Sequence, residues 1–217
     1  MRTQLIYKQK GITLIELLVA LTILGIVIGS IYRLFIAQTR AYTVQDQVVE
    51  VQQNVRGAME FLLRDLRMTG FDDDSTPAVT VPTPIKLPVQ ASSIEVSYER
   101  QNQRHTVHYW RDGSELKREL YIDEALIYSD VLLENVDGLT FTYGVDENDN
   151  GTMDDKSGNG KIDDADWLQA SAGITNVVAV RVTLTGRPDQ TNPDVKARVS
   201  PRELTSAVTF RNLIIMK

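Results

Sequence analysis

The sequence predicts an α+β protein in which one long amino-terminal helix precedes a domain of antiparallel strands. Three observations predict it: an apolar run that continues in helical phase, seven prolines confined to two later stretches, and two-residue alternation between and after those prolines. The chain has 217 residues, 42% hydrophobic and 24% charged, which is enough to bury a core in one or two domains. It has no cysteine, so disulfides and thiolate metal sites are excluded.

The amino-terminal segment predicts a membrane span. Residues 1–11 carry three basic residues and no acidic one, and residues 12–31 form an apolar run. Twenty helical residues are about 30 Å long, which matches the hydrocarbon thickness of a bilayer. The basic flank predicts that residues 1–11 stay in the cytoplasm and that residues after Tyr32 are exported. A cleaved secretory signal is the alternative, but its apolar region would be shorter and end at a small-residue cleavage site.

One acidic residue, Glu16, interrupts this apolar run. An ionised carboxylate at that depth costs about 2.5 to 3.5 kcal/mol unless it has a partner, and residues 12–31 include no Lys or Arg. One interpretation is a glutamate near enough to the interface to reach water. The other is a partner cation, and a free α-amino group made by cleavage before Ile12 would be such a cation.

Residues 11–20, GITLIELLVA, follow a short basic leader. This run resembles the processing and methylation motif of type IV pilins and type II secretion pseudopilins. The resemblance implies that a prepilin peptidase cleaves between Gly11 and Ile12 and methylates the new amino terminus. It also implies that Glu16 pairs with the terminal amine of a neighbouring subunit during assembly. The implied partners are the peptidase, the inner membrane, and other minor and major pilin subunits.

Beyond the span the apolar residues thin out but keep helical phase. No proline occurs before Pro77, so one helix is predicted over residues 12–69, ended by Gly70. A coiled-coil stalk is the alternative, but the strand-rich region that follows needs a cover, so we expect the carboxyl-terminal half to lie against a sheet. The apolar stripe that predicts this steps by three and four residues through Val44, Val48, Val51, Val55, Ala58, Leu62 and Leu66.

The rest of the chain reads as a Pro-rich connector over residues 70–92 and a strand-rich head over residues 93–217. The dipeptide Asp112-Gly113 predicts a two-residue hairpin turn. The prolines mark connectors or edge segments: Pro77, Pro82, Pro84, Pro88, Pro188, Pro193 and Pro201. Alternation predicts strands through residues 94–98, 107–109, 139–145, 178–184 and 208–210.

A second resemblance covers parts of the head. Residues 134–146 (ENVDGLTFTYGVD), 176–182 (NVVAVRV) and 209–212 (TFRN) resemble the PilW-type minor pilins, which are related to the J-type minor pseudopilins of type II secretion. The resemblance implies a pilin fold, with the long helix packed on an antiparallel sheet. The chain lacks the cysteine pair of many major pilins and has a larger globular part, and both departures favour a minor subunit.

The acidity of the chain is local. Residues 146–166 hold eight acidic residues and two lysines, and their net charge of −6 equals that of the whole chain. A nucleic-acid binder usually shows a basic face, and no segment here supplies a large one, so we predict no nucleic-acid partner. A concentrated acidic window favours cation binding.

Residues 155–166 fit a twelve-residue calcium loop, with oxygen side chains at places 1, 3, 5, 9 and 12 and glycine at place 6. The predicted ligands are Asp155, Ser157, Asn159, the carbonyl of Lys161, Asp163 and Asp166. An overlapping, less complete copy comprises Asp146, Asn148, Asn150, Thr152 and Asp154, with Ser157 at its twelfth place. The preceding strand argues against a true EF-hand, and a solvated turn cluster is the alternative. The number of calcium ions stays open.

No catalytic constellation is readable. The two histidines, His105 and His108, are three residues apart in a predicted strand and therefore lie on opposite faces. We predict a non-enzymatic minor pilin of a type IV pilus system that starts in the inner membrane, with a periplasmic head, and moves into the pilus. The alternatives are a J-type minor pseudopilin and, from another class, a membrane-anchored adhesin or DNA-uptake binding module.

Overall fold

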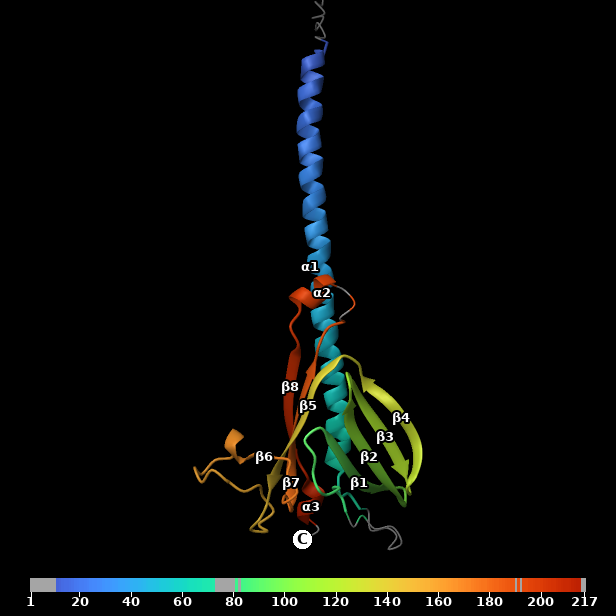
Figure 1. Ribbon diagram of the computed structural model, residues 1–217, viewed down its shortest axis with the longest axis vertical. Helices are drawn as coiled ribbons and strands as arrows, with labels where there is room; N and C mark the ends of the chain where they lie inside the picture. The colour runs from blue at the N-terminus through green and yellow to red at the C-terminus, as the bar shows by residue number, and fades with distance from the viewer. Residues whose placement is uncertain (1–10, 73–80, 82, 190, 192, 216–217) are drawn as a thin grey trace, which may run out of the picture. The chain divides into compact units, whose positions relative to one another are not determined.

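The computed structural model describes residues 11–72, 81, 83–189, 191 and 193–215. The predicted leader, apart from Gly11, and residues 73–80 and 82 of the predicted connector lie outside these residues. The chain divides into two compact units, Met1–Gln45 and Asp46–Lys217, and α1 (Leu14–Met68) begins in the first and ends in the second. The second unit contains the strands (Figure 1). The predicted α+β class is confirmed.

Helix α1 is slightly shorter than the predicted range of 12–69. It begins at Leu14 because Thr13 caps its amino terminus. It ends at Met68, and Gly70 follows with a φ of +71°, a left-handed conformation that favours glycine. The backbone N–H of Gly70 donates to the carbonyl of Ser97 at 2.9 Å, which ties the helix end to the first strand.

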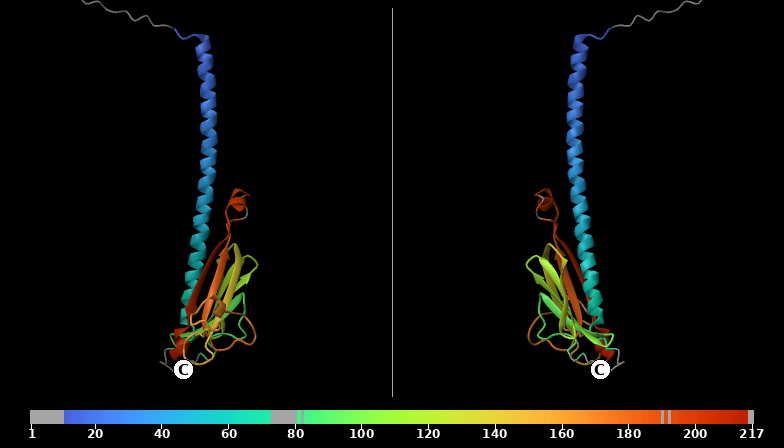
Figure 2. Two further views of the ribbon diagram at one scale, coloured as in Figure 1. Left: turned by 90° about the vertical axis from the view of Figure 1, so that its left-hand side faces the viewer. Right: turned by 90° about the vertical axis from the view of Figure 1, so that its right-hand side faces the viewer.

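The carboxyl-terminal part of α1 buries the predicted stripe within the second unit. Val44 and Val48, at the upstream end of the stripe, are only half-buried. From Val51 to Leu66 the stripe belongs to the same hydrophobic core as the strands, so the expected packing of this half of the helix along a sheet is confirmed (Figure 2). The helix residues that join the core are Val51, Val55, Ala58, Met59, Leu62, Leu63 and Leu66.

Two four-stranded antiparallel sheets pack around one hydrophobic core. Sheet A has the order β1-β2-β3-β4, with β1 (Ser93–Arg100), β2 (Gln103–Asp112), β3 (Glu115–Ile122) and β4 (Ala125–Leu133). Sheet B has the order β6-β5-β7-β8, with β6 (Leu168–Gln169), β5 (Val136–Val145), β7 (Val177–Gly186) and β8 (Arg202–Thr209). The elements η1 (Asp164–Asp166), α2 (Pro193–Arg198) and α3 (Arg211–Ile215) complete the order.

The predicted alternations correspond to β1, β2, β5, β7 and β8; β3 was predicted only as the strand after the hairpin turn, and β4 was not predicted. The hairpin turn lies one residue later than predicted, because Asp112 pairs with Glu115 and leaves Gly113 and Ser114 as the turn. Gly113 has a φ of +59°, so the glycine takes the first turn position. Pro77 and Pro82 lie outside the described residues; Pro84, Pro88, Pro188 and Pro201 lie outside strands, and Pro193 begins α2.

A buried ionic network fastens α1 to sheet A. The Asp65 carboxylate Oδ2 accepts hydrogen bonds from the Tyr109 hydroxyl at 2.7 Å and from Arg118 Nε and Nη2 at 2.9 and 2.7 Å. All three side chains are buried, and burial raises the pKa of the Tyr109 hydroxyl. The Arg118 guanidinium also lies 5.0 Å from the Tyr128 ring of β4. One carboxylate thus connects the helix to β2 and β3.

We predict that Arg118→Ala lowers the free energy of unfolding by about 3 to 5 kcal/mol, because it leaves a buried carboxylate without its cation. Lys86→Ala is the matched control. It breaks a 2.6 Å ion pair with Glu95 whose lysine is 66% exposed, and such a pair contributes less than about 1 kcal/mol. Urea unfolding of the full chain in detergent measures both changes. Equal losses in the two variants would contradict the buried-network interpretation.

Candidate functional site

The turn that begins at Asp155 has the backbone of a calcium-type loop. Asp155 Oδ1 accepts the N–H of Gly158 at 2.6 Å and the Ser157 hydroxyl at 2.9 Å, and its Oδ2 accepts the N–H of Gly160. Gly160, at place 6, has a φ of +82°, which is the sharp turn that this place requires. Asn159 accepts the N–H of Lys161 at 2.9 Å. The predicted places 1, 3, 5, 6 and 7 therefore form one compact turn.

The overlapping copy that begins at Asp146 repeats the same pattern. Asp146 is fully buried at the end of β5 and accepts the N–H groups of Asn150 and Gly151 at 3.1 and 2.8 Å. Gly151, again at place 6, has a φ of +80°, and Asn150 accepts the N–H of Thr152 at 2.8 Å. The sequence of this copy lacks a carboxylate at its twelfth place, but its first seven places form the same hydrogen-bonded turn as in the downstream copy.

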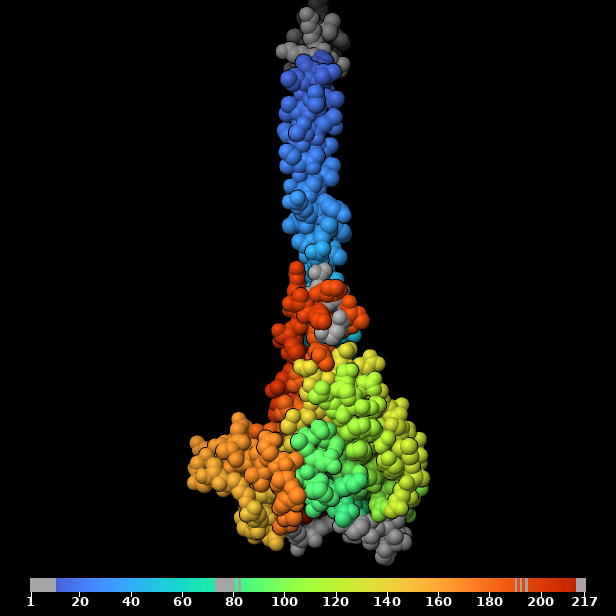
Figure 3. All heavy atoms as spheres, viewed as in Figure 1, coloured from blue at the N-terminus to red at the C-terminus, as the bar shows by residue number. Residues whose placement is uncertain are grey.

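The ninth places also correspond. In the upstream copy the Asn148 amide donates to Asp154 at 2.5 Å, and in the downstream copy the Asn159 amide donates to Asp163 at 2.6 Å. Each turn therefore closes on its own ninth-place carboxylate. The two copies lie in the segment that forms the orange projection in Figure 3.

The predicted twelfth ligand, Asp166, closes the downstream loop through backbone N–H groups. It is buried, and its two oxygens accept the N–H groups of Ser157 and Asp163 at 2.8 and 2.7 Å. These two hydrogen bonds hold the pKa of Asp166 below its ordinary value. Burial acts to raise the pKa of Asp155, but the donors from Gly160 and its neighbours outweigh burial and lower it.

Two cations pair with exposed acids of this window. Lys156 Nζ lies 2.5 Å from Glu147 Oε1, and Arg181 Nη1 lies 2.7 Å from Asp164 Oδ1. Within the described part of the chain, no three His, Asp or Glu side chains gather closely enough to hold a metal ion.

The second candidate site is the amino-terminal end of α1. The Glu16 carboxylate Oε2 accepts the backbone N–H of Thr13 at 2.8 Å and the Thr13 hydroxyl at 3.0 Å. In return, the Glu16 N–H donates to the Thr13 hydroxyl oxygen at 3.3 Å. This is a capping box, in which the N-cap residue and the third helical residue satisfy each other's backbone donors.

The capping box changes the interpretation of Glu16. From the sequence, Glu16 is a charge inside an apolar run that either reaches water or needs a partner cation, whereas the structure gives it donors within its own chain. The pattern Thr13-x-x-Glu16 was the signal for this cap, and for the start of the helix at Leu14. Gly11 and Ile12, the predicted cleavage residues, lie just before the cap in exposed, non-helical backbone.

The first third of α1, residues 14–31, presents apolar side chains on every side. Leu14, Leu18, Ile23 and Ile31 are each more than half exposed. Among the described residues, α1 is the one helix long and apolar enough to cross a membrane. A helix that is apolar all round and uncovered by its own chain fits a single-pass membrane anchor.

Residues 6–32 match the family model of the prokaryotic N-terminal methylation motif. The chain is type IV pilin-like. The match spans the predicted cleavage residues, the capping box and most of the anchor, and the helix-then-sheet order of this pilin-like protein agrees with it. The motif is shared by pilins and pseudopilins and does not distinguish between them. No curated protein matches the chain.

The acidic loop of the pilin-like protein depends on a glycine at place 6. We predict that Gly160→Ala lowers the free energy of unfolding by about 1 to 2 kcal/mol, because a Cβ strains a left-handed residue. No atom lies within 4 Å of the added Cβ, so backbone conformation alone is responsible. Gly173→Ala is the control, since its Cβ also meets open space and its φ is not positive. Urea unfolding that ranks Gly173→Ala as the worse variant would contradict this interpretation.

Proposed function

We propose that this pilin-like protein is a non-enzymatic minor pilin of a type IV pilus system. A prepilin peptidase removes residues 1–11, and the mature chain enters the filament or its initiating tip complex from the inner membrane, with its head on the periplasmic side. The observation that carries the proposal is the capped carboxylate of Glu16, which lies five residues beyond Gly11 inside the matched motif.

Cleavage between Gly11 and Ile12 leaves this cap intact. Thr13 becomes the second residue of the mature chain, so its N–H and hydroxyl still reach Glu16. Both donors end on Oε2, which leaves Oε1 for a cation from another molecule. The terminal amine of a neighbouring subunit is such a cation, and in an apolar helix bundle the pair holds the two subunits in register.

Two features of the head favour a minor subunit over a major one. The chain contains no cysteine, and its second unit, Asp46–Lys217, which holds the head, carries two sheets. The three segments that resemble PilW-type minor pilins fall on β5, on β7 and at the end of β8, which are neighbours in sheet B. The resemblance thus follows one continuous part of the fold, and we expect the head to make the contacts with other minor subunits.

A J-type minor pseudopilin uses the same anchor and the same capped carboxylate. Affinity purification of the full chain from its own cells separates the two functions, because an assembly factor follows its machine. Recovery of type IV pilus subunits supports the minor pilin, and recovery of type II secretion subunits replaces it with the pseudopilin.

We predict that Glu16→Gln leaves cleavage intact but lowers the amount of protein in filaments at least about tenfold, because losing one partner of a buried charge pair costs about 2 kcal/mol or more. A glutamine still accepts the Thr13 donors, so this variant removes the charge and keeps the cap. Mass spectrometry of the amino terminus measures cleavage, and immunoblotting of sheared filaments measures assembly.

Thr13→Ala is the reciprocal variant, since it removes the hydroxyl of the cap and keeps the carboxylate. We expect it to assemble better than Glu16→Gln. Normal assembly of Glu16→Gln would show that the charge has no role. A protein that begins at Met1 in cells with an active peptidase would remove the whole proposal.

We also propose that the acidic loop binds calcium in the exported head. The downstream turn would supply Asp155, Ser157, Asn159, the Lys161 carbonyl and Asp163, all oxygen donors of the kind that Ca²⁺ prefers. Asp166 would be the twelfth-place ligand, and its oxygens also accept the two N–H groups that close the loop. The upstream turn is the weaker site, because its twelfth place is Ser157.

If calcium binds, the metal-free chain should melt at a lower temperature, because an ion at a hundred times its dissociation constant stabilises the fold by about 2.7 kcal/mol. Calorimetry of the full chain with calcium, with magnesium and with chelator tests this. Asp155→Asn should abolish the calcium-dependent rise. Asp164→Asn is the matched control, since it removes the same charge from a 95% exposed side chain outside the proposed ligand set. A melt that does not respond to calcium would rule out the site.

A further inference from the structure

The face of sheet A that points away from α1 carries a regular grid of polar and aromatic side chains. Its opposite face is buried and contains Val96, Val107 and Tyr109. Because side chains alternate, the residues between these must point outward. Strand pairing aligns them in three rows across β1, β2 and β3: Ser93, Trp110 and Lys117; Glu95, His108 and Glu119; and Ser97, Thr106 and Tyr121.

The two histidines confirm this geometry. His105 is buried on the inner face and stacks on Tyr98, with ring centroids 5.4 Å apart. His108 lies on the outer face and stacks on Trp110, with centroids 4.6 Å apart and an angle of 16° between the rings. The pair forms an aromatic shelf that is only partly covered by its own chain.

Hydrogen bonds hold the neighbouring groups of this face in place. Glu119 accepts the Tyr121 hydroxyl at 2.8 Å and the Ser129 hydroxyl at 3.2 Å, and it lies 3.7 Å from His108 Nδ1. The hydroxyls of Ser97 and Thr106 lie 2.9 Å apart. The side chains are therefore ordered before any ligand arrives, which reduces the entropy lost on binding.

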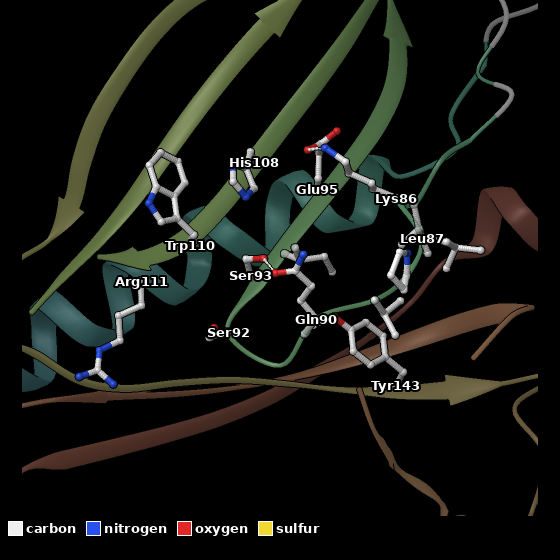
Figure 4. Close-up of a pocket in the computed structure, with 14 residues that line it drawn as sticks. Lys86, Leu87, Gln90, Ser92, Ser93, Glu95, His108, Trp110, Arg111 and Tyr143 are labelled. Carbon is white, nitrogen blue, oxygen red and sulfur yellow. Dashed lines mark hydrogen bonds and ion pairs between the residues drawn. The ribbon is translucent and has the colours of Figure 1, made fainter. Parts of the chain in front are cut away.

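Two adjacent cavities lie on this face and share Lys86 and Glu95. The first, of about 390 Å³, runs from Trp110 and His108 to the loop that carries Gln90 (Figure 4). The second, of about 460 Å³, is lined by Tyr121, Thr106 and Arg104, among others. Together they form one trough, which we call the sheet A trough. The two volumes together are large enough for a ligand of several linked rings.

Two of the three basic side chains that line the sheet A trough are paired with carboxylates. Lys86 lies 2.6 Å from Glu95, and Arg104 lies 2.5 Å from Glu124. Arg111, the third, lines the far end and donates from Nε to the carbonyl of Gly113 at 2.8 Å. Nucleic acids and other polyanions require several unopposed basic groups, so this pairing argues against them. A purely apolar ligand would leave the paired charges desolvated.

We propose that the sheet A trough binds a neutral oligosaccharide. The rings of Trp110 and Tyr121 present flat apolar surface to the C–H face of a sugar, while their polar atoms stay at the edge. The carboxylate of Glu95, the amide of Gln90 and the hydroxyl of Ser93 are acceptors and donors for sugar hydroxyls. This inference does not depend on the minor pilin proposal, since it uses sheet A and not the anchor or the methylation motif.

Calorimetric titration of the full chain with chitohexaose and cellohexaose tests the proposal. The detergent must have no sugar headgroup, because a maltoside would compete for the trough. We expect one of these neutral probes to bind, and a heparin oligosaccharide or single-stranded DNA of similar length to bind at least about tenfold more weakly. Failure of both neutral probes, or tighter binding of either polyanion, would overturn the proposal.

Variants locate the binding. Trp110→Ala should weaken binding of the neutral probe about tenfold, because it removes an aromatic contact and weakens the sugar hydroxyl contacts beside it. Trp110→Phe should retain most of the affinity. Trp167→Phe changes the second of the two tryptophans, which contacts Arg181, and should leave binding unchanged.

Glu95→Gln provides a variant that does not disturb the aromatic shelf. It keeps the size of the side chain and removes the charge that Lys86 balances, so it should weaken the neutral probe and strengthen the polyanions. Equal melting temperatures show that each variant is folded. Unchanged affinity in both Trp110→Ala and Glu95→Gln would place the binding elsewhere and overturn the proposal.

Discussion

The buried contact between Asp65 and Arg118 fixes how α1 meets sheet A. Apolar burial along the helix stabilises the head but has no direction. The carboxylate, by contrast, meets the Tyr109 hydroxyl and the Arg118 guanidinium at distances of 2.7 to 2.9 Å, and only one position of helix and strands allows this. Because strand side chains alternate, Tyr109 pointing inward places His108 and Trp110 outward. The outer face of sheet A is therefore a consequence of the inner network.

Carboxylates also accept backbone N–H groups at the start of α1 and in the two acidic turns. Glu16 receives the N–H of Thr13 at the start of α1, Asp146 receives two N–H groups at the end of β5, and Asp155 and Asp166 hold the downstream turn. In each place the acidic group satisfies donors that secondary structure leaves unpaired. The acidity of residues 146–166 consequently has a structural role before any ion is considered.

The sequence predicts the parts of the fold where side-chain polarity follows burial. The stripe of α1 and the alternation of β5 and β7 are of this kind, and their elements appear within a few residues of the predicted limits. β3 and β4 break the rule. Arg118 points inward to an ionic partner 53 residues away, and β4 exposes the adjacent residues Leu126 and Ile127 beside a register shift. Asp65 likewise occupies a buried helix position, although a hydrophobic pattern assigns a carboxylate to the solvent side of the helix.

The candidate sites divide in the same way. Sequence spacing located both place-6 glycines of the acidic turns, because a left-handed residue leaves a residue-type signal. The rows of the sheet A trough left none: Ser93, Glu95, Trp110 and Tyr121 come from three strands, and only the register of β1, β2 and β3 brings them together. Such a site depends on pairing between distant segments, which a local pattern does not contain.

In the acidic loop, the buried acids accept backbone hydrogen bonds and the exposed acids form the ion pairs. N–H donors satisfy the oxygens of the buried side chains Asp146 and Asp166, and they replace part of the hydration that each carboxylate loses on burial. Lys156 of this loop and Arg181 of β7 pair with exposed acids, Glu147 and Asp164 respectively. The positive charge supplied by the chain is thus placed where water already screens the acids. These two ion pairs do not involve Asp146 or Asp166, so the buried carboxylate of each turn is stabilised by backbone N–H donors.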